Sequence, residues 1–224
     1  MEVRWNPGRF AVACAADAGL ELPDSAANQY DAILAPRWPL FQQLNTERST
    51  EVLDEFWREQ TRLWLDAVGA PQHWVEPVRT EAEHQLYHTD RWFSLIQGTV
   101  EGLEMLKSKG HRLAVCSNWD RSLHRLIDAK NLSQYFEVVI ASLEEGVEKP
   151  EPGIFQAFCE RMNCDPIDVL HVGDDPIDDL QGAKTFGMHS AWLCPSASEK
   201  SHRVEDEFDR FVIRSLPELA EMLG

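Results

Sequence analysis

Four aspartates lie within six residues of the stretch HVGDDPIDDLQGAKTFGM, which spans 171–188: Asp174, Asp175, Asp178 and Asp179. Carboxylates this close repel one another unless a cation or a helix end stabilises them. Oxygen-only donors suit a hard cation, and Mg²⁺ in proteins is usually held by one or two carboxylates, waters and a substrate phosphate. The cluster therefore has two explanations, metal binding and helix capping.

Helix capping accounts for part of the cluster. A strand is predicted over 168–172, and Asp175 is placed to cap the helix that follows. Asp178 and Asp179 then lie in the first helical turn, where the helix dipole favours each negative charge by ~0.3–1 kcal/mol. Asp174 lies at the carboxyl end of the strand, where an isolated carboxylate is costly unless a cation joins it, with Asp179 as its neighbour. Taken by itself, the cluster fits either explanation.

A second polar stretch, CSNWD at 116–120, follows a predicted buried strand at 112–116. Because both stretches follow strands, the Ser117 hydroxyl and the backbone N–H groups of Ser117 and Asn118 are expected at the same crevice as the acids. Small polar residues ahead of a helix can cradle an oxyanion or phosphate. Read alone, Ser117 and Asn118 also fit a simple turn or helix cap.

A third stretch, VEKPEPGIF at 147–155, places Lys149 shortly after the predicted strand EVVIAS at 137–142. A loop lysine is ordinarily solvated, but here it is a fixed positive charge that could offset the carboxylates and a phosphoryl group. His171, inside the strand before the acids, is interpreted as a packing residue of the sheet rather than a ligand.

The spacing of apolar residues predicts the helices and strands that carry these side chains. Residues 8–93 are predicted to be helical almost throughout, with an apolar stripe in the helix near 51–69 and with tryptophans that serve packing. The stripe consists of Val52, Leu53, Phe56, Leu63 and Trp64, and the tryptophans are Trp57, Trp64, Trp74 and Trp92.

After Gly98 the pattern changes to alternating helices and short strands, which predicts an α/β fold with a parallel sheet between helices and a ligand site beyond the carboxyl ends of the strands. Thr99 is expected to cap the first of these helices. Strands are predicted at 112–116, 137–142, 168–172, 189–194 and 210–213, and helices at 99–109, 121–130, 154–162, from the acid cluster to 186, and from Ser215.

The amino-acid composition disfavours some classes of binding partner and indicates the cellular compartment. The formal charge of −17, from 38 acidic and 21 basic residues, disfavours nucleic acid and anionic membrane surfaces. No apolar stretch approaches the ~18–20 residues that a membrane span needs. Five scattered cysteines, an odd number without zinc-type pairs, suit reduced thiols in a cytoplasm. We therefore expect a cytoplasmic protein.

The ordered set SN, KPEPGIF and HVGDDPIDDLQGAKTFGM resembles motifs two, three and four of the haloacid dehalogenase superfamily of hydrolases. It is most similar to subfamily IA, whose helical cap lies between motifs one and two, and to its rhythmically-expressed-gene-2-like branch. The resemblance covers residues 97–195 closely, whereas 8–93 match only in helical character. It implies a Rossmann-like parallel sheet core at 94–224 with an inserted all-helical cap domain at 8–93.

The resemblance also implies phosphoryl transfer through an aspartyl-phosphate, with Mg²⁺ as cofactor and a small phosphorylated metabolite as substrate. By carry-over, Ser117 and Asn118 contact the phosphoryl group, Lys149 steadies the nucleophile and the transferred charge, and Asp174 binds Mg²⁺. Asp179 completes the acidic site, directly or through water. The acid pair favours a phosphatase over a 2-haloacid dehalogenase, whose chemistry needs no Mg²⁺.

The nucleophile motif of that family, DxDx[TV] at the end of the first strand, does not occur in these 224 residues. In the family this strand is central, so its loss leaves two ladders without partners, at ~1–3 kcal/mol for each unsatisfied backbone group. We expect the sequence to be part of a longer phosphatase. The alternatives are a non-catalytic module that binds phosphate and Mg²⁺ and, more weakly supported, a dehalogenase.

Overall fold

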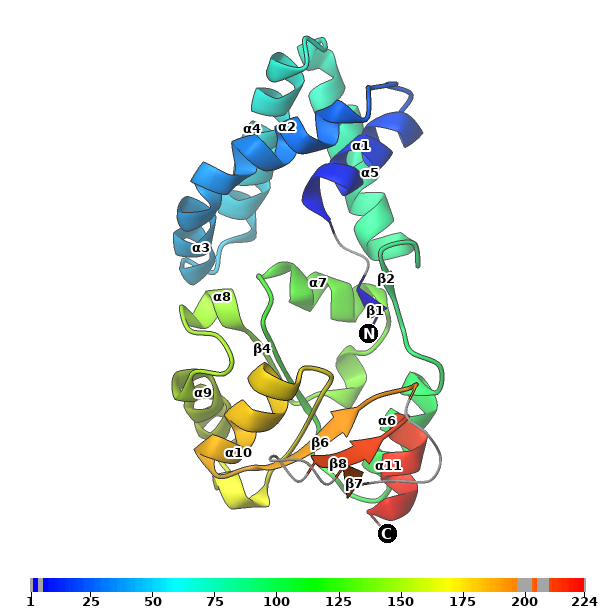
Figure 1. Ribbon diagram of the computed structural model, residues 1–224, viewed down its shortest axis with the longest axis vertical. Coiled ribbons are helices and arrows are strands. Elements are labelled where there is room, and N and C mark those ends of the chain that lie inside the picture. Colours follow the sequence, from blue (N-terminus) through cyan, green and yellow to red (C-terminus); the bar gives the residue numbers. More distant parts are fainter. Residues whose placement is uncertain (1, 4–5, 197–202, 205–209, 224) are drawn as a thin grey trace. The chain divides into compact units, whose positions relative to one another are not determined.

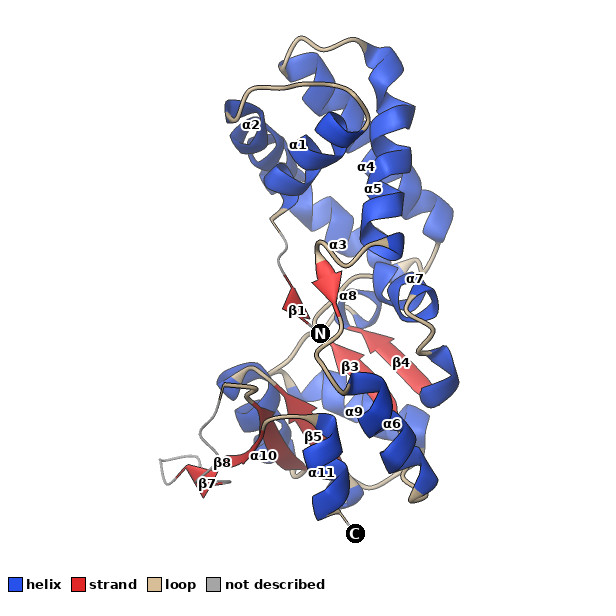
Figure 2. Ribbon diagram, turned by 90° about the vertical axis from the view of Figure 1, so that its right-hand side faces the viewer, coloured by secondary structure: helices blue, strands red, loops and turns tan. Residues whose placement is uncertain are grey.

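The computed structural model describes residues 2–3, 6–196, 203–204 and 210–223. The chain divides into two compact units, which we call the N-terminal unit (Met1–Leu95) and the C-terminal unit (Ile96–Gly224). Figures 1 and 2 together label their helices and strands.

The N-terminal unit is built almost entirely from helices. Its elements are β1 (Glu2–Val3), α1 (Pro7–Asp17), α2 (Ser25–Leu34), α3 (Trp38–Thr46), α4 (Thr50–Ala67), α5 (Val75–His88) and β2 (Phe93–Ser94). Helix α1 packs against α2 and α5, and α4 packs against α2 and α5. The strands β1 and β2 pair in antiparallel fashion, Glu2 with Ser94 and Val3 with Phe93, and this short ribbon was not predicted.

Helix α4 shows why this unit folds as helices. The Ser49 side chain caps it by accepting a hydrogen bond from the backbone N–H of Val52 at 3.3 Å. Phe56 and Trp64 are buried as predicted, whereas Leu63 is 37% exposed, so its place in the apolar stripe was wrong. The buried face of α4 is centred nearer to Gln60 and Trp64, which are fully buried in a helix that packs against α2, α3 and α5.

Tryptophan packing is clearest at Trp64, which is fully buried in the N-terminal unit. Its indole N–H donates to the Ala26 carbonyl at 2.8 Å, and its ring meets Tyr30 edge to face at 5.4 Å. Trp92 donates to the Gln85 side chain at 2.7 Å. Buried indoles usually find such a partner, so the packing role predicted for Trp64 and Trp92 agrees with their contacts.

The C-terminal unit alternates helices and strands, as expected for an α/β fold. Its helices are α6 (Thr99–Ser108), α7 (Ser122–Ala129), α8 (Ser142–Glu145), α9 (Pro152–Met162), α10 (Gly182–Phe186) and α11 (Leu216–Met222), with a π-helical turn, η5, at Pro176–Gln181. Its strands are β3 (Ala114–Ser117), β4 (Val138–Ala141), β5 (Leu170–Gly173), β6 (His189–Leu193), β7 (Arg203–Val204) and β8 (Arg210–Ile213). All five predicted strands are present within a few residues of their expected bounds, and β7 is additional.

The strands of the C-terminal unit form two separate sheets, one with β3 and β4 and one with β5, β6, β8 and β7 (Figure 2). Strand β3 pairs in parallel with β4, Ala114 opposite Val138. The second sheet has the order β5, β6, β8, β7, with parallel pairs except for the antiparallel pair of β7 and β8. Within the described residues, β3 and β5 are thus both edge strands, at the place where a central strand was expected to be missing.

The edge strands β3 and β5 are less buried than β4. All residues of β3 and β5 are only half-buried, whereas Ile140 and Ala141 of β4 are fully buried. Strands inside a parallel sheet are normally buried on both faces, so the half-buried strands agree with their edge positions. The larger core cluster lies between β4, α9 and α10 and contains Ile140, Ile154, Phe155, Cys159, Ala183 and Met188.

The predicted start of α11 is confirmed, and the predicted cap of α6 is corrected. The last helix begins at Ser215 as expected, and the Ser215 side chain caps α11 by accepting from the backbone N–H of Glu218 at 3.3 Å. Helix α6 is preceded by Gly98 in a left-handed conformation, φ 80°, while Thr99 is its first residue and donates its hydroxyl hydrogen to the Ile96 carbonyl. Among the described residues, no helix combines the length and apolar character needed to cross a bilayer.

Candidate functional site

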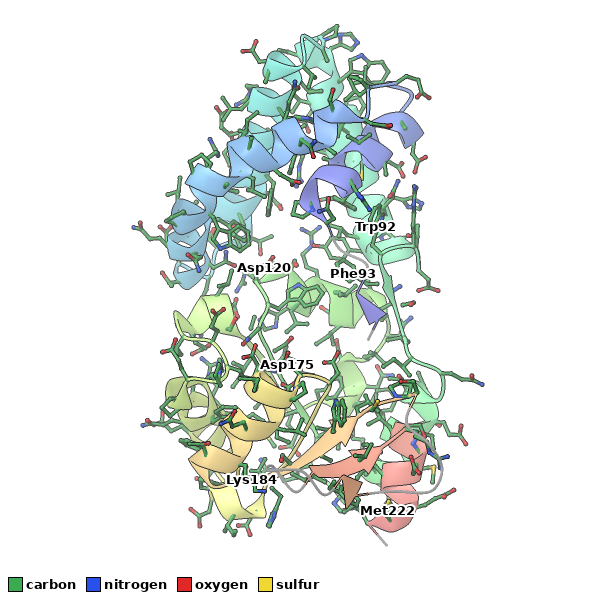
Figure 3. All side chains as sticks on the ribbon, in the orientation of Figure 1. Trp92, Phe93, Asp120, Asp175, Lys184 and Met222 are labelled. Atoms are coloured by element: carbon green, nitrogen blue, oxygen red, sulfur yellow. The ribbon has the colours of Figure 1, made fainter. Side chains whose placement is uncertain are left out.

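The predicted site residues come together at the carboxyl ends of β3 and β5. The Lys149 ammonium, on the loop after β4 and α8, donates to the Cys116 carbonyl at 3.2 Å and to Asp179 Oδ1 at 2.5 Å. Ser117 follows Cys116 in β3, and Asp174 follows the last residue of β5. Lys149 therefore joins the ends of the two edge strands. In Figure 3, Asp120 and Asp175, which follow β3 and β5, lie toward the same end of the C-terminal unit, away from Lys184 and Met222.

Asn118 fixes the backbone of Lys149. Its side-chain amide donates to the Lys149 carbonyl at 2.9 Å, and its side-chain oxygen accepts from the Lys149 backbone N–H at 2.8 Å. The same amide donates to Asp178 Oδ2 at 3.3 Å. Because both amide hydrogens are engaged, the Asn118 side chain positions Lys149.

Asp179 is the most enclosed carboxylate of the cluster. The exposed fractions of the Lys149 and Asp179 side chains are 9% and 7%. Asp179 Oδ1 also lies 2.9 Å from His171 Nε2, and Asp179 Oδ2 accepts from the Asp175 backbone N–H at 3.0 Å. Burial opposes ionisation of Asp179, but the hydrogen bond from His171 and the Lys149 charge outweigh it and hold its pKa well below the ordinary value.

Gly173 allows Asp179 to reach this position. A Cβ atom at Gly173 would lie 2.1 Å from the Asp179 carboxylate, far inside van der Waals contact. Asp179 thus folds back against the last residue of β5, which explains why the strand ends in glycine. His171, predicted to be a packing residue, meets the Phe155 ring edge to face at 5.7 Å and also contacts Asp179, so it does both.

Asp175 caps η5, and Asp178 lies in the first turn of η5, both as predicted. Asp175 Oδ1 accepts from the backbone N–H groups of Ile177 and Asp178, each at 2.8 Å, which satisfies the start of η5. The Asp178 carboxylate also accepts a hydrogen bond from the Asn118 side-chain amide, a contact that was not predicted. Burial, followed by the charges of Asp175 and Asp179, raises the pKa of Asp178 above its ordinary value. Unrelieved negative charge therefore remains at this end of the cluster.

The donor set that remains fits a hard cation. Asp174 is exposed, its carboxylate has no hydrogen-bond partner among the described residues, and only its backbone carbonyl is engaged, by the Trp192 indole at 3.0 Å. The two oxygens of Asp179 already accept three hydrogen bonds. Asp174 is thus available as a direct oxygen ligand, and Asp179 is better placed to act through water. The described part of the chain contains no group of three or more His, Cys, Asp or Glu side chains arranged around a metal.

A second buried acid, Glu144 in α8, braces the loop after β3. Its carboxylate accepts from Arg121 at 2.5 Å and lies 2.8 Å from His124 Nε2, both at the start of α7 or just before it. Burial works against its ionisation, but the hydrogen bonds from His124 and Arg121 lower its pKa overall. Nearby, burial raises the pKa of Asp120, whose carboxylate accepts from the Ser122 backbone N–H at 2.6 Å.

Sequence reasoning missed these contacts for a common reason. The pair Asn118 and Asp178 and the pair Arg121 and Glu144 are 60 and 23 residues apart, so no local spacing connects them. For Asp178, the only available signal was its place beside Asp179, which fits a helix cap equally well.

Comparison with known proteins gives a consistent family. The sequence profile of haloacid dehalogenase-like hydrolases matches residues 15–187. The human haloacid dehalogenase-like hydrolase domain-containing protein 3 is 32% identical over 168 residues, which cover 71% of this chain and 65% of that protein. Glyceraldehyde 3-phosphate phosphatase of Pyrococcus furiosus is 30% identical over 145 residues, which cover 61% of this chain and 58% of that enzyme. The chain thus spans about two thirds or less of these relatives.

Among solved structures, 2-haloacid dehalogenase from Pseudomonas syringae is similar in fold, with a TM-score of 0.63 and 21% identity over 100% of this chain and 94% of that one. This similarity agrees with the α/β architecture of the C-terminal unit. The chain therefore belongs to the haloacid dehalogenase-like hydrolases.

Proposed function

We propose that this hydrolase is a Mg²⁺-dependent phosphatase of a small phosphate ester, and that the C-terminal unit supplies its phosphate and metal site. The observation that carries the proposal is the position of Lys149, which is held between the end of β3 and the buried Asp179 beside β5. A fixed ammonium group between a polar loop and an acid cluster suits a transferred phosphoryl group and a divalent cation together. The phosphatase from Pyrococcus furiosus supports a small phosphorylated metabolite as substrate.

Each residue has a role that fits its surroundings. Ser117, whose hydroxyl has no hydrogen-bond partner among the described residues, and the Asn118 backbone N–H would hold the phosphoryl oxygens. Lys149 would offset the charge of the phosphoryl group, and Asn118 keeps its backbone in place. Asp174 would hold Mg²⁺ directly and Asp179 through water. When bound, Mg²⁺ would neutralise the acids and draw charge from the phosphoryl oxygens.

The aspartyl-phosphate route needs a carboxylate nucleophile, and the 224 residues contain no DxDx[TV] motif. The edge strands β3 and β5 lie in separate sheets with their carboxyl ends joined by Lys149. We propose that a strand carrying this motif completes the sheet between them in the longer phosphatase. The N-terminal unit would serve as the helical cap that selects the substrate, in a protein of the cytoplasm.

Turnover tests the role of Lys149. A chain that also carries the nucleophile strand is expected to hydrolyse p-nitrophenyl phosphate with Mg²⁺, and Lys149→Ala should lower kcat to the background rate because the transferred charge loses its counter-charge. Lys184→Ala is the matched control, since Lys184 is an exposed lysine at the other end of the unit. Equal turnover of Lys149→Ala and the unsubstituted protein would reject the proposal.

A non-catalytic module is the second candidate, favoured by the missing motif in a chain whose Asn118 and Lys149 contacts are intact. A folded 224-residue chain that binds inorganic phosphate with Mg²⁺ but never turns over, even with the strand restored, would support it. A dehalogenase is the third candidate and is less favoured by the acid cluster. Halide release from a 2-haloacid without Mg²⁺ would identify that activity.

A further inference from the structure

Helix α9 ends in a motif that brings two cysteine side chains together. Asn163 adopts a left-handed conformation, φ 48°, directly after the helix, and its backbone N–H donates to the Glu160 carbonyl at 3.3 Å. The Cys164 backbone N–H donates to the Cys159 carbonyl at 3.2 Å. These two bonds define the Schellman motif. In this motif the side chain four residues before the left-handed residue often makes an apolar contact with the side chain directly after it.

In this chain the two contacting side chains are thiols. Cys159 and Cys164 occupy the C3 and C″ positions of the motif, the two positions whose side chains approach each other. Cys159 is 9% exposed and belongs to the core cluster beneath α9, and Cys164 packs against the same cluster while remaining half-buried. A disulfide requires adjacent Cβ atoms on approaching backbones, and the Schellman motif supplies that approach.

We propose that Cys159 and Cys164 form a reversible intramolecular disulfide when the protein meets a hydroperoxide or a disulfide oxidant. With hydrogen peroxide, the Cys164 thiolate attacks an oxygen, the O–O bond breaks, and hydroxide leaves with the electron pair to give a sulfenic acid. The Cys159 sulfur, after losing its proton, then attacks the Cys164 sulfur. The S–S bond forms, the S–O bond breaks and water leaves.

The surroundings assign the order of these steps. Cys164 is the more exposed of the two, so the oxidant reaches it first. Burial, followed by the adjacent Cys164 thiol, raises the pKa of Cys159 to about 11, so Cys159 stays protonated while Cys164 reacts with the oxidant. In the second step the Cys159 proton passes to the departing hydroxide, which leaves as water. The bridge would fix the end of α9, one turn after Phe155, whose ring contacts His171 of the candidate site.

Peptide mapping tests the bridge in the intact 224-residue chain. Arg161 lies between the two cysteines, so trypsin separates Cys159, in the peptide 131–161, from Cys164, in 162–184. After treatment with hydrogen peroxide, we expect these peptides to migrate as one disulfide-linked species that dithiothreitol separates, in a protein that stays monomeric on a non-reducing gel. Cys194→Ser should keep this species and Cys164→Ser should lose it.

The redox equilibrium in glutathione buffers shows whether the fold favours the bridge between Cys159 and Cys164 over the same bridge in the unfolded chain. In glutathione buffers the folded chain should reach half-oxidation at about one tenth of the oxidised-to-reduced ratio that the urea-unfolded chain requires, a gain of about 30 mV. An equal or higher ratio for the folded chain would overturn the proposal. So would peroxide treatment that yields only sulfinic acid at Cys164, or only bridges between two chains.

Discussion

The contact between Lys149 and Asp179 is the residue-scale centre of the candidate site. Both side chains are nearly buried, and Asp179 Oδ1 accepts from both Lys149 and His171. A buried ion pair gains little over an apolar pair, but removal of one partner leaves an uncompensated charge. The pair therefore holds the ends of β3 and β5 together only while both charges are present.

Asp179→Asn should lower the free energy of unfolding by about 3 kcal/mol at pH 7, because the buried Lys149 ammonium loses its counter-charge. The pKa of Asp179 in the folded protein lies below its ordinary value, which is about 3.9. Its contribution is therefore fully present above pH ~4 and is lost as the pH falls through the lowered pKa. Urea titrations of both proteins at several pH values measure the difference.

Asp168→Asn is the control for this experiment, since Asp168 is exposed in the same unit. Its free energy of unfolding should stay within about 0.5 kcal/mol of the unsubstituted protein. A penalty for Asp179→Asn that grows as the pH falls below 4 would contradict the direction of the pKa shift.

Between β5 and η5, the chain reverses so tightly that one glycine decides the geometry. Gly173→Ala would place a methyl group 2.1 Å from the Asp179 carboxylate, which forces Asp179 away from Lys149. We expect a loss of about 2–3 kcal/mol in the free energy of unfolding. Gly153→Ala is the matched control, because its nearest contact is the movable Val147 side chain at 3.2 Å. Equal unfolding midpoints for the two variants would show that Asp179 does not need this space.

The elements of the C-terminal unit were predictable because their signals are local. Strands such as β4 are short apolar runs. Ser215 directly precedes α11 and caps it through the backbone N–H of a residue three positions later. The β1–β2 ribbon escaped prediction because two residues on each side carry no periodicity and their pairing spans 92 residues in the register Glu2 to Ser94. Thr99 was mistaken for a cap because serine and threonine favour that position, whereas Gly98 supplies the left-handed turn.

The sequence predicted which residues lie together at the candidate site, but not which contacts their side chains make. Ser117, Lys149 and Asp174 each follow a strand, and the carboxyl ends of neighbouring strands share one edge, so their proximity could be expected. The direction of each side chain could not, because the Asn118 amide chooses between phosphate, Lys149 and Asp178 through contacts that depend on three separate elements.

At the scale of the whole molecule, the net charge of −17 destabilises the compact state through self-repulsion. Raising KCl from about 20 mM to about 300 mM shortens the screening length from roughly 20 Å to roughly 6 Å. We expect the Tm at pH 7 to rise by about 2–5 °C. Near the sequence pI of about 4.8 the same addition should have little effect. A Tm that falls with salt at pH 7 would indicate that ion pairs outweigh the net repulsion.

The C-terminal unit contains two separate sheets, whose facing edge strands are β3 and β5. Strands β3 and β5 present half-buried edges at the site, and Lys149 joins their ends. The acids beyond β5 are thus held by the fold itself, so metal binding can be tested directly on the 224-residue chain.

Calorimetric titration of that chain with Mg²⁺ in the presence of inorganic phosphate is the most direct measurement. We expect one Mg²⁺ per chain, with affinity lowered about tenfold or more in Asp174→Asn and unchanged in Asp168→Asn. Absence of Mg²⁺ binding by the folded protein, or equal affinity in Asp174→Asn, would contradict the central claim that a divalent cation neutralises the acids at the end of β5.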